Sequence, residues 1–298
     1  MKRVWMPARP NGRSLRAWTS LVLLPAVLSA CGGGLESDSG GQASRLTCAT
    51  TCKPSSSLAT DQIRPSFVVV SDGTRAQAQA GFSSGSDFRF NVEIDGTDSL
   101  RLSTTQGTQG FHIPAGSLST VVVDALRTLV AGATPYLSEL TPVAGTLPVQ
   151  FQFVRGSTTY ASSVELPAPF QITAPASGTT VPIATRRLSV ALTSATAPTV
   201  NSATFACTDV NGNTATGSPT LNVVPGSLAS TASGVSYVLD VGEAVDGLIF
   251  STNFPRSAVA RCDLTLQLIV QAQGQADTRF ADTQIFAQQI RSVTLAMR

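Results

Sequence analysis

The sequence has little charge, and it has almost no tryptophan, lysine or histidine. Charged residues occupy 13% of its 298 positions, about half of the share that is usual in a soluble domain. Both tryptophans, Trp5 and Trp18, lie near the N-terminus, so the rest of the chain has no indole on which a sugar ring could stack. Lys53 is the single lysine after residue 30, which excludes Schiff-base chemistry and a Gly-x-x-x-x-Gly-Lys phosphate loop from the predicted domains.

The charge balance argues against a nucleic-acid partner. Five basic residues and no acidic residue fall within positions 1–30. The remaining chain carries 15 basic and 18 acidic residues, a net charge of −3. Because nucleic-acid binding depends on basic surface, we expect no such partner. The 42% of hydrophobic residues is ample for a packed core and excludes wholesale disorder.

The first 30 residues have the pattern of an export signal. A basic segment, Lys2 to Arg16, precedes an apolar stretch from Trp18 to Leu28, and small residues follow. The apolar stretch is too short to cross a bilayer, which takes about 20 apolar residues, and no other segment comes close to that length. We therefore predict a signal peptide over residues 1–30.

The signal ends in Leu28-Ser29-Ala30-Cys31, and three glycines follow. This sequence resembles the lipobox of bacterial lipoproteins, which implies that the chain is cut before Cys31 and that Cys31 carries the lipid anchor, palmitate included. Gly32 stands where an aspartate would favour the inner membrane, so the resemblance points to the outer membrane. The alternative is an ordinary signal peptide with a chance cysteine. The sequence leaves open whether the anchored chain faces the periplasm or the cell surface.

Four further cysteines, in a chain predicted to be exported, indicate two disulfides with three possible connectivities. Cys207 and Cys262 each lie on the apolar face of an alternating run, which suits a bridge across a sandwich core, as in immunoglobulin-like domains. Cys48 and Cys52 would then form a small local clip. A redox pair is usually Cys-x-x-Cys, one residue shorter. Zinc needs four ligands, and the chain's one histidine is His112, so we expect no metal at this pair.

From residue 66 onward the dominant hydrophobic period is two, which indicates β-strands. The turn dipeptides Asp72-Gly73, Asp95-Gly96 and Asn211-Gly212 are of the hairpin type. Short strands with glycine turns about every ten residues favour β-sandwiches over a parallel sheet. The clearest runs are 75–82, 88–94, 147–153, 160–166, 188–192, 204–207, 221–223, 237–239, 262–270 and 293–297.

Two segments interrupt the strand pattern. Residues 118–129 have helical spacing of their apolar positions, although the β-branched run from Thr120 to Val123 would also suit a strand. Residues 166–178 contain three prolines and are typical of a joint between domains. The predicted organisation is therefore a flexible Gly/Ser-rich tether over 31–60 and β-sandwiches over 61–170 and 171–298.

The joint contains Pro-Ala-Pro-Phe at residues 167–170 and Thr-Ala-Pro-Ala-Ser-Gly at residues 173–178. These motifs and the cysteine-paired segment beyond them resemble uncharacterised proteobacterial lipoproteins with tandem immunoglobulin-like domains. The resemblance covers about half of the chain. It implies an all-β fold of two tandem immunoglobulin-like sandwiches after the signal peptide and tether. It implies no activity.

One catalytic motif matches: Gly81-Phe82-Ser83-Ser84-Gly85 fits the Gly-x-Ser-x-Gly elbow of hydrolases. An elbow needs a helix after the serine, whereas strand-patterned residues follow here, and the general base would have to be His112. A hairpin turn is the interpretation that we favour. The loops at Asp95–Asp98 and Asp209–Asn213 offer oxygen ligands for calcium, but they lack EF-hand spacing, and turns explain both.

The sequence thus predicts an outer-membrane-anchored lipoprotein that is structural or that binds a ligand or an envelope or surface protein, with no catalysis, cofactor or metal. Sandwich edges and loops bind partners without any sequence motif. The alternatives are a serine esterase-like hydrolase that uses Ser83 and His112, and an accessory subunit of a secretion or pilus assembly.

Overall fold

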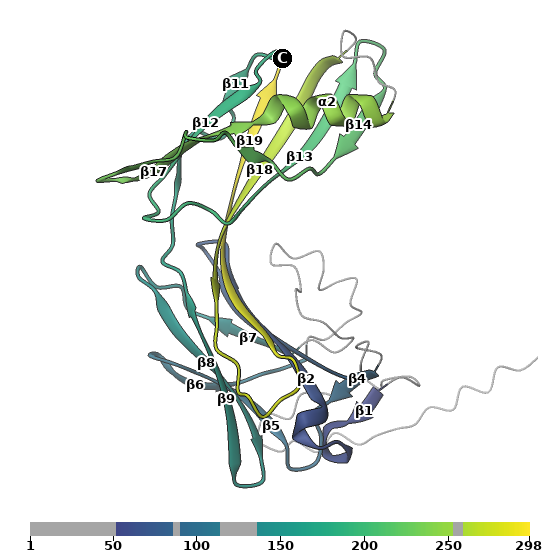
Figure 1. Ribbon diagram of the computed structural model, residues 1–298, viewed down its shortest axis with the longest axis vertical. Helices are drawn as coiled ribbons and strands as arrows, with labels where there is room; N and C mark the ends of the chain where they lie inside the picture. Colours follow the sequence, from purple (N-terminus) through teal and green to yellow (C-terminus); the bar gives the residue numbers. More distant parts are fainter. Residues whose placement is uncertain (1–51, 86–89, 114–135, 253–258) are drawn as a thin grey trace, which may run out of the picture. The chain divides into compact units, whose positions relative to one another are not determined.

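A computed structural model describes residues 52–85, 90–113, 136–252 and 259–298 of the chain (Figure 1). The predicted signal peptide, Cys31, Cys48 and the segment 118–129 lie outside these residues. Strands dominate the described part, and the predicted all-β sandwich class is confirmed. Among the described residues, no helix has both the length and the apolar character that crossing a membrane requires.

The first sandwich is built mainly from residues 52–166. Its two sheets have the strand orders β1-β4-β3-β2-β19, where β19 is Gln284–Met297, and β6-β5-β8-β9, and β7 pairs with β3. The strands are β1 (Cys52–Pro54), β2 (Ile63–Ser71), β3 (Ala76–Ser84), β4 (Phe90–Glu93), β5 (Ser99–Thr104), β6 (Gly107–Gly110), β7 (Tyr136–Leu140), β8 (Leu147–Arg155) and β9 (Thr158–Leu166), with 3-10 helices η1 (Ser55–Ser57) and η2 (Thr60–Gln62) after β1.

Aromatic side chains fill the core of this sandwich because alternate strand residues point inward. On β8, Phe151 and Phe153 are fully buried, and Phe151 stacks on Phe67 of β2 with ring centroids 4.6 Å apart. Burial of each such ring contributes about 1.5–3 kcal/mol. Isolated bridges connect the two sheets at both edges, from His112 to Leu137 and from Ser163 to Gln275. These bridges cover backbone groups that an open sheet edge would leave unpaired.

The second sandwich has the strand order of an immunoglobulin domain. One sheet runs β10-β12-β17-β15 and the other β14-β13-β18-β19, with β11 in parallel against the end of β19. The first sheet thus has the order A-B-E-D, and in the second sheet β13, β18 and β19 are strands C, F and G, with β14 as an additional strand C′ beside C; this is the immunoglobulin arrangement. The strands are β10 (Ile172–Ala174), β11 (Thr180–Val181), β12 (Arg187–Leu192), β13 (Val200–Asp209), β14 (Thr214–Gly217), β15 (Asn222–Val223), β16 (Ala229–Thr231), β17 (Gly234–Asp240), β18 (Val259–Gln273) and β19 (Gln284–Met297).

Strand β19 contributes side chains to both hydrophobic cores. Ile285 and Ala287 pack in the first core, whereas Val293, Leu295 and Met297 pack in the second. All five have odd numbers, so a single inward-facing alternation runs along the whole strand. The predicted second domain, 171–298, therefore contributes residues to both cores.

Two details of the predicted organisation need correction. Residues 52–60, expected in the tether, form β1, η1 and the start of η2, and Ser55 is fully buried. The dipeptide Asp95-Gly96 does not close a hairpin: it carries the chain from β4 in one sheet to β5 in the other. The hairpins at Asp72-Gly73 and Asn211-Gly212 are confirmed, since they join β2 to β3 and β13 to β14.

A helix that the sequence analysis missed, α2 (Val241–Thr252), follows β17 (Figure 1). Its start has a side-chain cap, because the carboxylate of Asp240 accepts a hydrogen bond of 3.0 Å from the backbone N–H of Glu243. An aspartate followed three residues later by glutamate is a recognised start signal for helices.

Candidate functional site

Ser83, the serine of the Gly-x-Ser-x-Gly motif, is an interior residue of strand β3. It is 1% exposed, and its hydroxyl donates to the backbone carbonyl of Arg64 on β2 at 3.3 Å. The motif continues to Gly85 with strand pairing to β4 at Ser83 and Ser84. A nucleophile elbow instead projects its serine from a sharp turn into a helix.

His112 does not reach Ser83. Its backbone pairs with Leu137 of β7, and Leu137 pairs with Gln79 of β3. His112 is thus two strands away and four residues along β3 from Ser83. With strand spacings of about 4.8 Å and a rise of about 3.3 Å per residue, the two backbones are on the order of 15 Å apart. The structure therefore does not bring together the two residues that the hydrolase hypothesis requires.

The carboxylates of the first calcium candidate, the loop Asp95–Asp98, accept hydrogen bonds from other parts of the chain. The carboxylate of Asp98 accepts from Arg155 at 2.6 Å and from the Ser55 hydroxyl at 2.7 Å. Asp95 accepts from the backbone N–H and the hydroxyl of Ser56 at 2.9 and 3.0 Å. Arg155 also donates to the carbonyl oxygens of Ser55 and Leu58 at 2.8 and 2.9 Å. The carboxylates therefore attach η1 to the first sandwich.

The second calcium candidate is a turn in the β13–β14 hairpin. The Asp209 carboxylate accepts from the side-chain amide of Asn213 and from the backbone N–H groups of Asn211 and Asn213, each at 2.8 Å. These hydrogen bonds, chiefly that from the Asn213 side chain, hold the pKa of Asp209 below its usual value. In the described part of the chain, no group of three or more His, Cys, Asp or Glu residues could hold a metal ion.

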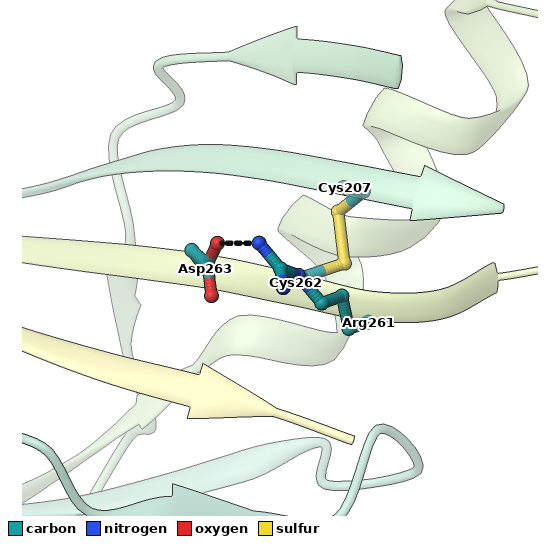
Figure 2. The surroundings of a disulfide bond; sticks show 4 residues. All are labelled: Cys207, Arg261, Cys262 and Asp263. Atoms are coloured by element: carbon teal, nitrogen blue, oxygen red, sulfur yellow. Dashed lines mark hydrogen bonds and ion pairs between the residues drawn. A yellow bond between two sulfur atoms is a disulfide. The ribbon is translucent and has the colours of Figure 1, made fainter. Parts of the chain in front are cut away.

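The predicted Cys207–Cys262 disulfide is confirmed, but the predicted path across the core is wrong. Cys207 on β13 and Cys262 on β18 are direct partners in antiparallel pairing, with Cα atoms 3.9 Å apart. Figure 2 shows the bond crossing between neighbouring strands of one sheet. Immunoglobulin domains of antibodies instead join strands B and F of opposite sheets. Both cysteines do point inward, since each is 0% exposed.

The remaining cysteine predictions fall mostly outside the described residues. Cys52 is disulfide-bonded, while Cys48, its predicted partner, and Cys31, the predicted lipidation site, lie before residue 52. Their pairing and acylation stay predictions.

A groove in the first sandwich is lined mainly by polar side chains. It has a volume of about 610 Å³ and lies where β5, β8 and β9 meet the end of β18. Its lining carries the hydroxyls of residues 103–105 and Ser163, the amides of Gln150, Gln273 and Gln275, and the carboxylate of Glu165. The volume is within the range of about 300–1,000 Å³ that is typical of ligand sites.

Strand register brings these polar side chains into one row. Ser103 of β5 is opposite Gln150 of β8, Gln150 is opposite Ser163 of β9, and Ser163 pairs with Gln275. The residues next to them in each strand, such as Val149 and Val164, are buried. The row therefore lies on the face away from the core. The side-chain oxygen of Gln150 accepts a hydrogen bond of 2.6 Å from the side-chain amide of Gln152.

Gly274 allows the row to extend past the edge of β9. A Cβ atom at this position would lie 2.4 Å from the carbonyl oxygen of Ser163 and 2.8 Å from Cβ of Val164. The backbones of residues 163 and 275 exchange hydrogen bonds of 2.8 and 2.7 Å beside it. Only glycine permits this approach, because any side chain would push the two segments apart.

An ion pair fixes the chain just beyond the groove. The guanidinium of Arg279 lies 4.2 Å from the ring centroid of Tyr160 and pairs with Asp277. Asp277 also accepts from the backbone N–H of Ala161 at 3.0 Å. The hydrogen bond from Arg279 lowers the pKa of Asp277 to about 2. These contacts hold residues 277–279 against β9.

Sequence reasoning missed this groove because its residues carry no motif. Each is a common polar residue on the outer face of a strand, and four separate segments contribute. A sequence signal exists only at Gly274, which interrupts a long alternating strand pattern and so marks a close backbone approach.

No family model and no curated protein matches the chain. Among solved structures, a similar chain is the chimeric titin Z1Z2 functionalised with a KLER exogenous peptide from decorin. The two are 13% identical over 79% of this chain and 97% of that chain, with a TM-score of 0.19. A similarity of that size does not define the fold of this chain, which follows from its strand order and register.

Proposed function

We propose that the protein is an outer-membrane lipoprotein, anchored through Cys31, that binds an extended polypeptide segment of an envelope or surface partner without catalysing a reaction. The observation that carries the binding role is the polar row Ser103–Gln150–Ser163–Gln275 along an open groove. The anchor rests on the lipobox-like sequence Leu28–Cys31.

The chemistry of the lining favours a polypeptide. Amide and hydroxyl side chains both donate and accept, which matches the alternating N–H and C=O groups of an extended backbone. The groove lining contains no aromatic side chain among the described residues, and sugars commonly stack on such rings. Glu165 supplies the one charge of this lining, so a lysine or arginine of the partner would complement it.

Site-specific photo-crosslinking in cells tests the binding role. A photoreactive residue replaces Gln275 in the groove or, as control, the exposed Ser189 on β12 of the second sandwich. We expect a discrete crosslinked partner from position 275 and none from position 189. The same products from both positions, or none from position 275, would contradict the proposal.

Labelling with radioactive palmitate tests the anchor separately. The wild-type chain should incorporate the label, and Cys31→Ser should not. Equal labelling of both chains, or of neither, would refute lipidation at Cys31 and leave the groove hypothesis intact.

A further inference from the structure

A second cavity, of about 370 Å³, lies where β1, η2 and the start of β2 meet the end of β3. Its lining combines opposite charges, Lys53 and Asp61, with the hydroxyl of Ser84 and the apolar side chains of Leu58 and Ala281. This cavity shares no lining residue with the groove described above. Any ligand here is therefore independent of the proposed partner.

The hydroxyl of Ser84 is buried without a partner. The residue is 2% exposed, and its Oγ makes no hydrogen bond with any described residue. Leaving a buried polar group unsatisfied is unfavourable, and native structures contain few such groups. Ser84 follows the motif serine Ser83 and is one of the residues that line the cavity.

Two of the three charged side chains of the lining, Lys53 and Asp61, are also available to a ligand. Lys53 has its ammonium group 4.1 Å from the ring centroid of Phe90, and no carboxylate of the described residues pairs with it. Asp61 is exposed and likewise forms no ion pair within the described part of the chain. Arg64, a third charge of the lining, is paired with Asp282 at 2.5 Å, so its charge is already balanced.

We propose that this cavity binds a small zwitterion that carries an anionic oxygen group and a primary ammonium group. The anionic group accepts hydrogen bonds from Lys53 and from the Ser84 hydroxyl, and the ammonium group pairs with Asp61. Leu58 and Ala281 contact the carbon atoms between the two charges. The volume lies at the small end of the range for ligand sites, which suits a molecule of this size. Free amino acids and the phosphoethanolamine headgroup of lipids share this chemistry.

Isothermal titration of the full-length protein in a nonionic detergent tests the proposal. The probes are glycine and O-phosphoethanolamine, with inorganic phosphate and ethanolamine as the two halves of the second probe. We expect at least one zwitterion to bind at least tenfold more tightly than either half. If phosphate alone binds as tightly as both zwitterions, or if no probe binds up to about 10 mM, the proposal is wrong. Preference between the two zwitterions distinguishes a free amino acid from a lipid headgroup.

Variants locate the binding in this cavity. Ser84→Ala should raise the urea midpoint, because it removes an unpaired buried hydroxyl, and should weaken zwitterion binding at least tenfold. Lys53→Gln should weaken binding to a similar degree. The matched control is Ser66→Ala, which removes another buried hydroxyl without a partner among the described residues, outside the cavity, and should leave binding unchanged. Wild-type affinity in Ser84→Ala and Lys53→Gln would overturn the proposal.

Discussion

Replacement of Arg155 by methionine should strongly destabilise the first sandwich. The Asp98 side chain is 3% exposed and that of Arg155 is 23% exposed, and the two form a 2.6 Å ion pair. Methionine keeps much of the stem of Arg155 but removes its bonds to Asp98 and to the carbonyl oxygens of Ser55 and Leu58. Breaking a buried pair by removing one partner costs about 3–5 kcal/mol. Because the Ser55 hydroxyl still donates to Asp98, we expect the free energy of unfolding to fall by about 3 kcal/mol, the lower end of this range.

The matched control is Arg261→Met on β18. Arg261 and Asp263 also form an ion pair (Figure 2), at 2.9 Å, but their side chains are 53% and 46% exposed. An exposed pair contributes about 0–1 kcal/mol, so this variant should unfold nearly as the wild type does.

Urea unfolding followed by circular dichroism measures both variants, and hydrogen exchange of residues 55–62 shows whether η1 and η2 detach first. If Arg155→Met costs no more free energy of unfolding than Arg261→Met, the reasoning about this network is refuted.

Three further predictions concern the groove, the disulfide and acid stability. Gly274→Ala should lower the free energy of unfolding by about 2 kcal/mol or more, since its Cβ would lie 2.4 Å from the Ser163 carbonyl oxygen. The control Gly145→Ala, with open space around it, should change the free energy of unfolding in urea by less than about 0.5 kcal/mol. Equal effects of the two substitutions would contradict the close approach at Gly274. The double variant Cys207→Ala, Cys262→Ala should have a free energy of unfolding lower by about 2–5 kcal/mol, because the disulfide closes a loop with a sequence separation of 55. Free thiols at these positions in the wild-type protein, detected by mass spectrometry, would exclude the disulfide. The pKa of Asp277 is about 2 when folded and about 3.9 when unfolded, so its stabilising contribution is complete above about pH 4 and is lost as pH falls toward about 2. Asp277→Asn should reduce the acid dependence of stability in that window, and an unchanged pH profile would argue against the Arg279 contact.

Much of the fold follows from period-two patterning alone. The alternation from Cys262 to Val270 correctly indicates a strand with Cys262 facing the core, and the run with Phe205 and Cys207 does the same for β13. Alternation specifies which face a residue occupies but not which strand lies beside it. For this reason the cysteine pairing was predictable, whereas its location within one sheet was not.

The division between the cores was harder to predict for a similar reason. The odd-numbered residues of β19 face inward from Ile285 to Met297, so no change of pattern marks the passage from one core to the other. The proline-rich segment 166–178 was visible in the sequence, but only the register of β19 with β2 shows that the chain returns to the first sandwich.

The candidate groove depends even more on register. Ser103, Gln150 and Ser163 are far apart in sequence and become neighbours only through the pairing of β5, β8 and β9. Polar residues on the outer face of a strand are common, so their composition gives no signal. The serine of the Gly-x-Ser-x-Gly sequence, which does match a motif, lies instead in the interior of a strand.

The most direct test of the binding role is crosslinking from position 275 in two Glu165 variants. Glu165→Arg reverses the single charge of the groove lining, whereas Glu165→Gln keeps the size of the side chain and its capacity for hydrogen bonds. The account predicts that the crosslinked partner is lost with Glu165→Arg and retained, at reduced yield, with Glu165→Gln. Undiminished crosslinking in Glu165→Arg would show that the partner does not bind in the groove, and would contradict the central claim.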